Sequence, residues 1–227
     1  MSKKKGKNSN YSGKVDTKVL PYKKDAPKKT FFEKYKNYII WSVCALLFVS
    51  IVLGIVLSSI PKDPVYVEMD FGPYGKIVIE VDRNTAPKTA KNFIKLVKKG
   101  FYDGLTIFRA QKDFVIQGGE NENVKLRPIR GEFASNGYKN DISHTRGVIS
   151  MARTKEPNSA TSQFFITLHD NAAYSLDGDY AGFGHVVEGM EVVDKIANTL
   201  YGHATDSMGF VDDSYAIKIV SAKIIDK

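Results

Sequence analysis

The chain has 227 residues and contains 33 lysines and arginines against 25 aspartates and glutamates, a formal net charge of +8. Its single cysteine, Cys44, excludes an internal disulfide, and its four histidines lack the H-x-x-x-H spacing of a zinc site. The G-x-S-x-G motif of serine hydrolases and the P-loop are also missing, so neither a metal nor another cofactor is expected.

The positive charge lies in residues 1–37, where twelve lysines against three acidic residues give a net charge of +9. Because the whole chain carries +8, residues 38–227 sum to −1. High charge with few apolar residues predicts a disordered, solvated tail. Binding of nucleic acid or anionic lipid is the alternative for the tail. The tail has few aromatic residues among its lysines and contains no arginine, which disfavours recognition of nucleic-acid bases. Nucleic acid is therefore not an expected partner.

Residues 38–60 form an apolar run of 23 residues without a charge. As a helix this run spans roughly 34 Å, enough to cross a hydrocarbon core about 30 Å thick. The basic tail then predicts a single-pass protein of the cell membrane, with the N-terminus cytoplasmic and the rest of the chain outside. A signal peptide cleaved near residues 56–58 is the alternative, although the run is long for a signal sequence and no A-x-A site closes it.

A short linker, residues 61–64, leads to residues 65–227, which are enough for one ordinary domain with its own core. Apolar runs predict strands at 65–71, 74–81, 105–108, 114–117, 148–152, 164–168, 182–187 and 215–225, and helical periodicity predicts helices at 85–99 and 191–199. Residues 119–146 are a long polar loop. Many short strands with two isolated helices favour a mainly β fold, a closed antiparallel barrel capped by two α-helices.

Three blocks of the domain are distinctive in sequence. Phe108-Arg109 precedes F-V-I-Q-G-G at 114–119, S-Q-F-F-I lies at 162–166, and L-D-G at 176–178 precedes F-G-H-V at 183–186. In order and spacing these blocks resemble the cyclophilin family of peptidyl-prolyl cis-trans isomerases. The resemblance extends from about residue 65 to the C-terminus, and the tail and apolar run outside it make a membrane-anchored bacterial form the expected type. The resemblance implies an eight-stranded barrel closed by two helices, with X–Pro bond rotation catalysed in a groove on its outside.

The resemblance also implies the catalytic residues. Arg109 is expected to donate a hydrogen bond to the prolyl nitrogen, which becomes a good acceptor only when the amide twists. Gln117 is expected to orient the arginine, and Gln163 to hold the substrate backbone with it. The reaction needs no nucleophile, metal or titrating base, which agrees with their absence from the sequence.

The other positions that match groove residues are Phe114, Val115, Ala152, Arg153, Phe165, Leu176 and Tyr180. The resemblance implies that the apolar side chains at 114, 115, 165 and 176 form the proline pocket. It also implies that residues 152–153 pair with the substrate backbone before the proline. Adjacent side chains of a strand point to opposite faces, and Phe165 is predicted to face the groove while Phe164 fills the barrel.

Three positions depart from the family's usual pattern. Arg153 stands where the family often has asparagine, Ser175 where it often has tryptophan, and Tyr180 where it often has histidine. Arg153 is expected to favour acidic residues before the proline. Loss of the indole at position 175 is expected to weaken inhibition by cyclosporin, which occupies the same groove in cyclophilins.

The sequence therefore predicts a membrane-anchored prolyl isomerase that acts on unfolded or newly secreted proteins outside the cytoplasmic membrane. One alternative is a tethered chaperone or interaction module that binds proline-containing segments with little turnover. A second alternative is a structural anchor for a larger complex, which would depend on the tail and the apolar run alone.

Overall fold

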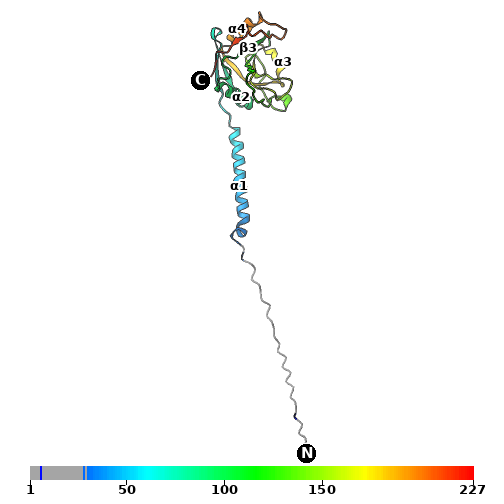
Figure 1. Ribbon diagram of the computed structural model, residues 1–227. Coiled ribbons are helices and arrows are strands. Elements are labelled where there is room, and N and C mark those ends of the chain that lie inside the picture. The colour runs from blue at the N-terminus through cyan, green and yellow to red at the C-terminus, as the bar shows by residue number, and fades with distance from the viewer. Residues whose placement is uncertain (1–5, 7–27, 29) are drawn as a thin grey trace, which may run out of the picture. The chain divides into compact units, whose positions relative to one another are not determined.

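The computed structural model describes residues 6, 28 and 30–227, so most of the tail predicted at residues 1–37 lies outside the described residues. The chain divides into two compact units, residues 1–60 and residues 61–227, which are described separately. In the first unit, helix α1 extends over Phe31–Ser59 (Figure 1).

Helix α1 starts at a capping box. The Thr30 hydroxyl accepts a hydrogen bond from the backbone N–H of Glu33 at 3.4 Å, and the Glu33 carboxylate accepts one from the backbone N–H of Thr30 at 3.2 Å. Residues 31–37, expected to belong to the disordered tail, are therefore helical because this cap starts the helix before the apolar run. Residues Phe31–Leu57 are long and apolar enough to cross a membrane, a property that a signal sequence near the N-terminus shares.

The second unit is built on one antiparallel sheet of nine strands in the order β8-β3-β4-β6-β5-β7-β2-β1-β9. The strands are β1 (Val65–Asp70), β2 (Lys76–Val81), β3 (Thr106–Gln111), β4 (Val115–Gly118), β5 (Val148–Met151), β6 (Phe164–Thr167), β7 (Ala181–Glu188), β8 (Ile217–Lys218) and β9 (Ser221–Ile225). The helices of this unit are α2 (Pro87–Lys98), the short α3 (Ala173–Leu176) and α4 (Met190–Tyr201). The mainly β class with helices is confirmed.

The predicted closure into a barrel of eight strands is not confirmed, because the sheet is curled but its hydrogen-bonded order is open. The run predicted as one strand over residues 215–225 is divided into β8, which pairs with β3, and β9, which pairs with β1. Between them the Ile219 N–H donates to the carbonyl of Leu105, and the Val220 N–H donates to the carbonyl of Asp70. An alternating pattern predicts which face of a strand is buried, but it does not predict which other strands pair with that strand.

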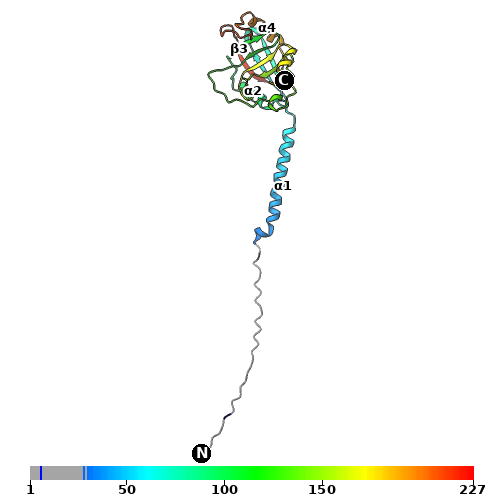
Figure 2. The ribbon, with the colours of Figure 1, turned by 90° about the vertical axis from the view of Figure 1, so that its right-hand side faces the viewer.

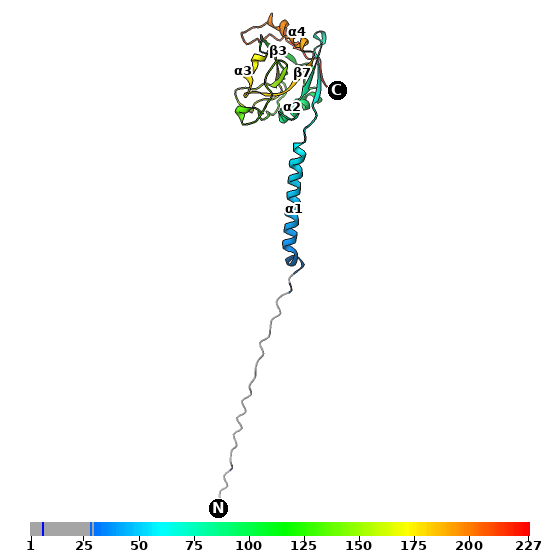
Figure 3. The ribbon, with the colours of Figure 1, turned by 180° about the vertical axis from the view of Figure 1, so that it is seen from behind.

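Helices α2 and α4 cover opposite ends of the domain, as Figure 2 and Figure 3 show from two directions. Helix α2 begins at Pro87, buries Phe93 and Val97 on one face, and is followed by Gly100 at φ +62°. The Phe93 ring lies 5.0 Å from the ring of Phe183 on β7, centroid to centroid. This contact fixes the helix against the sheet, and its lysines lie on the exposed face.

Two apolar clusters lie on opposite faces of β6. Phe164 belongs to the main core, while Phe165 belongs to a smaller cluster with Val115, Ala172 and Leu176. The two adjacent phenylalanines thus point to opposite faces, and the smaller cluster forms the floor of the candidate site.

Candidate active site

Strand β3 presents Arg109 with its side chain half-buried and held at every nitrogen. Its Nε donates to the carbonyl of Met208 at 2.8 Å, its Nη1 to Oε1 of Gln117 at 2.8 Å, and its Nη2 to Oε1 of Gln111 at 2.6 Å. The ring of Phe210 lies 5.3 Å from the guanidinium carbon. A guanidinium has five N–H groups, so two remain for a substrate, one on each Nη.

A chain of side-chain amides sets the orientation of Gln117. Its Nε2 donates to Oε1 of Gln163 at 2.8 Å, and Nε2 of Gln163 donates to Oε1 of Glu120 at 2.7 Å. The oxygen of Gln117 is therefore directed at Arg109. Burial lowers the pKa of Arg109, partly opposed by the negative charge of Asp206, and the guanidinium still stays charged at neutral pH.

A cavity of about 240 Å³ opens beside this guanidinium. Its lining residues are Arg109, Phe114, Val115, Gln117, Ala152, Arg153, Phe165, Leu176, Tyr180, Met208 and Phe210. The Tyr180 ring stands edge-on to the Phe165 ring, with centroids 5.4 Å apart. Mostly apolar walls with a few directed donors suit a small apolar ring carried on a polar backbone.

The structure brings the predicted site residues together, except that Gln163 reaches the cavity only through Gln117. Sequence reasoning missed Gln111, Met208 and Phe210. Gln111 follows Arg109 by two positions on one strand, so the period of two could have identified it. Met208 is 99 residues from Arg109 in sequence and lies in a segment without periodicity, so no local signal could have found it.

Arg153 provides a second fixed cation at the edge of the cavity. Its guanidinium carbon lies 4.6 Å from the ring centroid of Tyr180 and 5.0 Å from that of Phe133. Its Nε donates to the carbonyl of Asp179 at 2.8 Å, and its Nη1 donates to the carbonyl of Thr154 at 2.9 Å. The two rings and the two carbonyls hold the charge at a defined position.

The backbone beside Arg153 shows which groups remain for a substrate strand. The Ala152 N–H donates to the carbonyl of Gln163 at 2.9 Å, so it is not available to a substrate strand. Among the bonds of the described residues, the backbone N–H and carbonyl of Arg153 have no partner. Pairing with an extended peptide would therefore use the backbone of Arg153 and the carbonyl of Ala152. A hollow of about 140 Å³, lined by residues 152–154, 159, 161 and 163, lies alongside.

The buried side chain of His144, hydrogen-bonded to Asp177 and Ser150, packs against the ring of Phe165. Nδ1 of His144 lies 2.8 Å from Oδ1 of Asp177, its Nε2 lies 3.0 Å from Oγ of Ser150, and its ring stacks on Phe165 at 5.9 Å between centroids. Burial lowers the pKa of His144, although the hydrogen bond to Asp177 opposes this, so the neutral imidazole bridges the two side chains at pH 7. The group has the composition of a hydrolase triad, but Ser150 is fully buried and cannot reach a substrate.

Known proteins are similar to this chain in sequence and in fold. Residues 66–224 match the family described as cyclophilin type peptidyl-prolyl cis-trans isomerase/CLD. A peptidyl-prolyl cis-trans isomerase of Acinetobacter baylyi is 44% identical over 187 residues, which cover 78% of this chain and 94% of the relative. Peptidyl-prolyl cis-trans isomerase B of Escherichia coli is 41% identical over 142 residues, which cover 58% of this chain and 84% of the relative.

A crystal structure of a Cryptosporidium parvum cyclophilin type isomerase is similar in fold, with a TM-score of 0.60 and 26% identity. The match covers 72% of this chain and 99% of that chain. A second structure of it, determined in the presence of the dipeptide Ala-Pro, matches with a TM-score of 0.59 and 27% identity. Both crystallised chains therefore lack a counterpart of the first unit, and residues 61–227 form a compact unit of their own.

Proposed function

Since this chain belongs to the cyclophilin-type peptidyl-prolyl cis-trans isomerase family and is thus an isomerase of X–Pro bonds, we propose that Arg109 carries its activity. The observation that supports this role above all is the three-point fixation of the guanidinium by Met208, Gln117 and Gln111 beside an apolar cavity. The side chain is held before a substrate arrives, so no reorganisation is needed as the reaction proceeds.

The reaction is limited by the amide resonance of the X–Pro bond, which imposes a rotational barrier of about 18–20 kcal/mol. In the twisted transition state the nitrogen lone pair is no longer delocalised, and the nitrogen accepts a hydrogen bond. The free N–H groups of Arg109 donate to it there, and much less well to the planar nitrogen of the ground state. The arginine therefore binds the transition state more tightly than the substrate, which lowers the barrier.

The remaining residues hold the proline and the chain before it. Phe114, Phe165 and Leu176 enclose the ring in the cavity, and the group around His144 keeps Phe165 in position. The free backbone N–H and carbonyl of Arg153 pair with the residues that precede the proline. One part of the peptide is thus fixed while the other rotates.

The proposed location is based on the N-terminal segment. Residues 1–37 are the cytoplasmic tail, residues 38–60 the membrane span and residues 61–64 the linker, and the isomerase domain of residues 65–227 faces the outside. Its substrates are unfolded or newly secreted proteins, in which slow prolyl isomerisation limits folding. The apolar helix and the net charge of +9 in residues 1–37 support this topology. Protease added to spheroplasts should digest the domain, whereas its protection would contradict the arrangement.

The competing function is a tethered module that binds proline-containing segments without turnover. A coupled proline-isomerisation assay on residues 61–227 separates the two. We expect Arg109→Ala to lower kcat/KM by about 10²–10³, the scale of losing one preorganised donor. Arg127→Ala, which removes an exposed arginine from the long loop, is the matched control. An active Arg109→Ala domain would favour the binding module.

A further inference from the structure

A second hollow of the domain lies away from the catalytic cavity. Its volume is about 700 Å³, and it shares no lining residue with that cavity. The lining residues come from α2, from the adjoining strands and from the linker. The cations among them are Lys62, Arg83, Lys91, Lys95, Lys98 and Lys99, and no lining residue is acidic. We call this the basic hollow.

The charge of the basic hollow is concentrated and uncompensated. Residues 38–227 sum to a charge of −1, yet six cations surround this one feature. Among the described residues none of the six side chains forms an ion pair. Lys91, Lys95, Lys98 and Lys99 recur at the spacing of one helical face and are all exposed.

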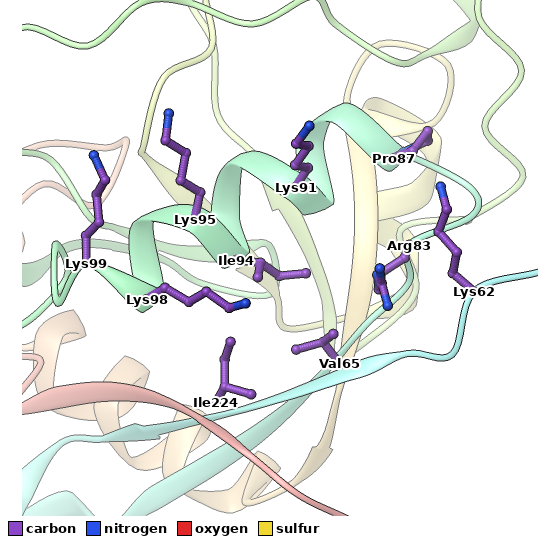
Figure 4. Close-up of a pocket in the computed structure, with 10 residues that line it drawn as sticks. All are labelled: Lys62, Val65, Arg83, Pro87, Lys91, Ile94, Lys95, Lys98, Lys99 and Ile224. Carbon is purple, nitrogen blue, oxygen red and sulfur yellow. The ribbon is translucent and has the colours of Figure 1, made fainter. Parts of the chain in front are cut away.

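The floor of the basic hollow is apolar. Val65 of β1, Ile94 of α2 and Ile224 of β9 lie close together, and Lys98 extends alongside them (Figure 4). In that view Lys91, Lys95 and Lys99 extend from α2 and its C-terminal end in the opposite direction, which leaves the aliphatic side chains open on one side of a row of cations. A cationic rim over an aliphatic floor fits an amphiphile, a phosphate-bearing headgroup with the beginning of its acyl chains. No aromatic side chain lines the hollow for a nucleic-acid base to stack on.

The linker is fastened to the rim of the same hollow. The Lys62 N–H donates to Oδ1 of Asn84 at 2.9 Å, and Nδ2 of Asn84 donates back to the Lys62 carbonyl at 2.9 Å. Lys62 is the third residue after Ser59, the end of α1. Covalent geometry alone keeps the Cα atoms of Ser59 and Lys62 within about 11 Å of each other, close to the Debye length of about 8 Å in physiological salt.

We propose that the basic hollow docks the isomerase domain onto the anionic lipid surface of the membrane that α1 enters. This proposal rests on the proposed membrane span. A domain tethered by α1 stays at high local concentration beside the membrane, so even a weakly binding surface can dock. Docking leaves the catalytic cavity, which shares no residue with the hollow, available to substrates. Lysines near an anionic surface attract it additively, so loss of three is expected to weaken binding roughly 100-fold.

The test uses residues 61–227, which lack the basic tail, in cosedimentation with phosphatidylcholine vesicles with or without about 30% phosphatidylglycerol. The wild-type domain should bind the anionic vesicles only. The triple variant Lys91→Gln, Lys95→Gln, Lys98→Gln should lose binding, since glutamine preserves helix propensity and removes charge. The matched control Lys112→Gln, Lys125→Gln, Lys139→Gln loses the same charge at exposed lysines elsewhere and should keep it.

Equal loss in both triple variants, or equal binding to neutral vesicles, would overturn the proposal. The proposal would also be overturned if inorganic phosphate released the domain from the vesicles more than chloride did at equal ionic strength, because the hollow would then be a site for a small anion. Tighter binding to single-stranded RNA than to vesicles would also overturn it. Turnover of a soluble X–Pro peptide by the same sample tests the isomerase function independently of vesicle binding.

Discussion

Replacing Arg109 by lysine asks whether the reaction needs a guanidinium or only a positive charge. The three acceptors that hold Arg109 engage three different nitrogens, and the spare N–H groups lie on two of these. A lysine has one nitrogen with three donors, so it cannot satisfy Met208, Gln117 and Gln111 and still present a donor to the prolyl nitrogen.

The expected magnitude follows from these contacts. Losing one preorganised donor costs about 2.7–4 kcal/mol of transition-state stabilisation. The ammonium recovers part of this as an undirected charge in a half-exposed site, about 1 kcal/mol. A net loss of about 2–3 kcal/mol corresponds to a fall in kcat/KM of roughly 30–150-fold. A coupled isomerisation assay on residues 61–227 measures this value, with urea unfolding as the control for stability.

The predicted fall applies to turnover and not to stability, because Arg109 belongs to neither apolar cluster. A kcat/KM of Arg109→Lys within threefold of the wild type would refute the reasoning, because a positive charge without the planar set of guanidinium N–H donors would then suffice. An equal fall in kcat/KM and in unfolding free energy would also refute it, since the arginine would then be a structural residue.

Three further substitutions test other parts of the site. Ser175→Trp should tighten cyclosporin inhibition by roughly 30–150-fold without a matching gain in turnover, and nanomolar inhibition of the natural domain would contradict this. Arg153→Asn should remove a preference for glutamate before proline, measured as the kcat/KM ratio of Glu-Pro to Lys-Pro peptides. His144 has a lowered pKa, so the folded state binds fewer protons than the unfolded state and unfolding free energy should rise from about pH 5 to 7. His144→Gln should flatten that rise in urea titrations, and an unchanged slope would assign it to other groups.

Local patterns predicted much of this domain for identifiable reasons. The lysines and apolar residues of α2 alternate at helical spacing, so a helix was predicted there, and Phe93 and Val97 lie on its buried face. The catalytic blocks were found through their resemblance to the cyclophilin family, and residues adjacent in one block, such as Phe114 and Val115, line the same cavity. The partner switch at Ile219 was not predictable, since it depends on two strands remote in sequence. The same limit hid the contact of Met208 with Arg109.

The pairing of β1 with β9 also orders events during synthesis. The first strand of the domain has its outer partner at Ser221–Ile225, so the sheet cannot be completed until residues 221–225 have left the ribosome. Until then one edge of β1 keeps unpaired N–H and carbonyl groups beside Val67 and Met69, which are fully buried in the finished fold. A nascent chain stalled or truncated before Ser221 therefore exposes a strand edge prone to aggregation, and a chain that lacks residues 221–225 would become a target for proteolysis.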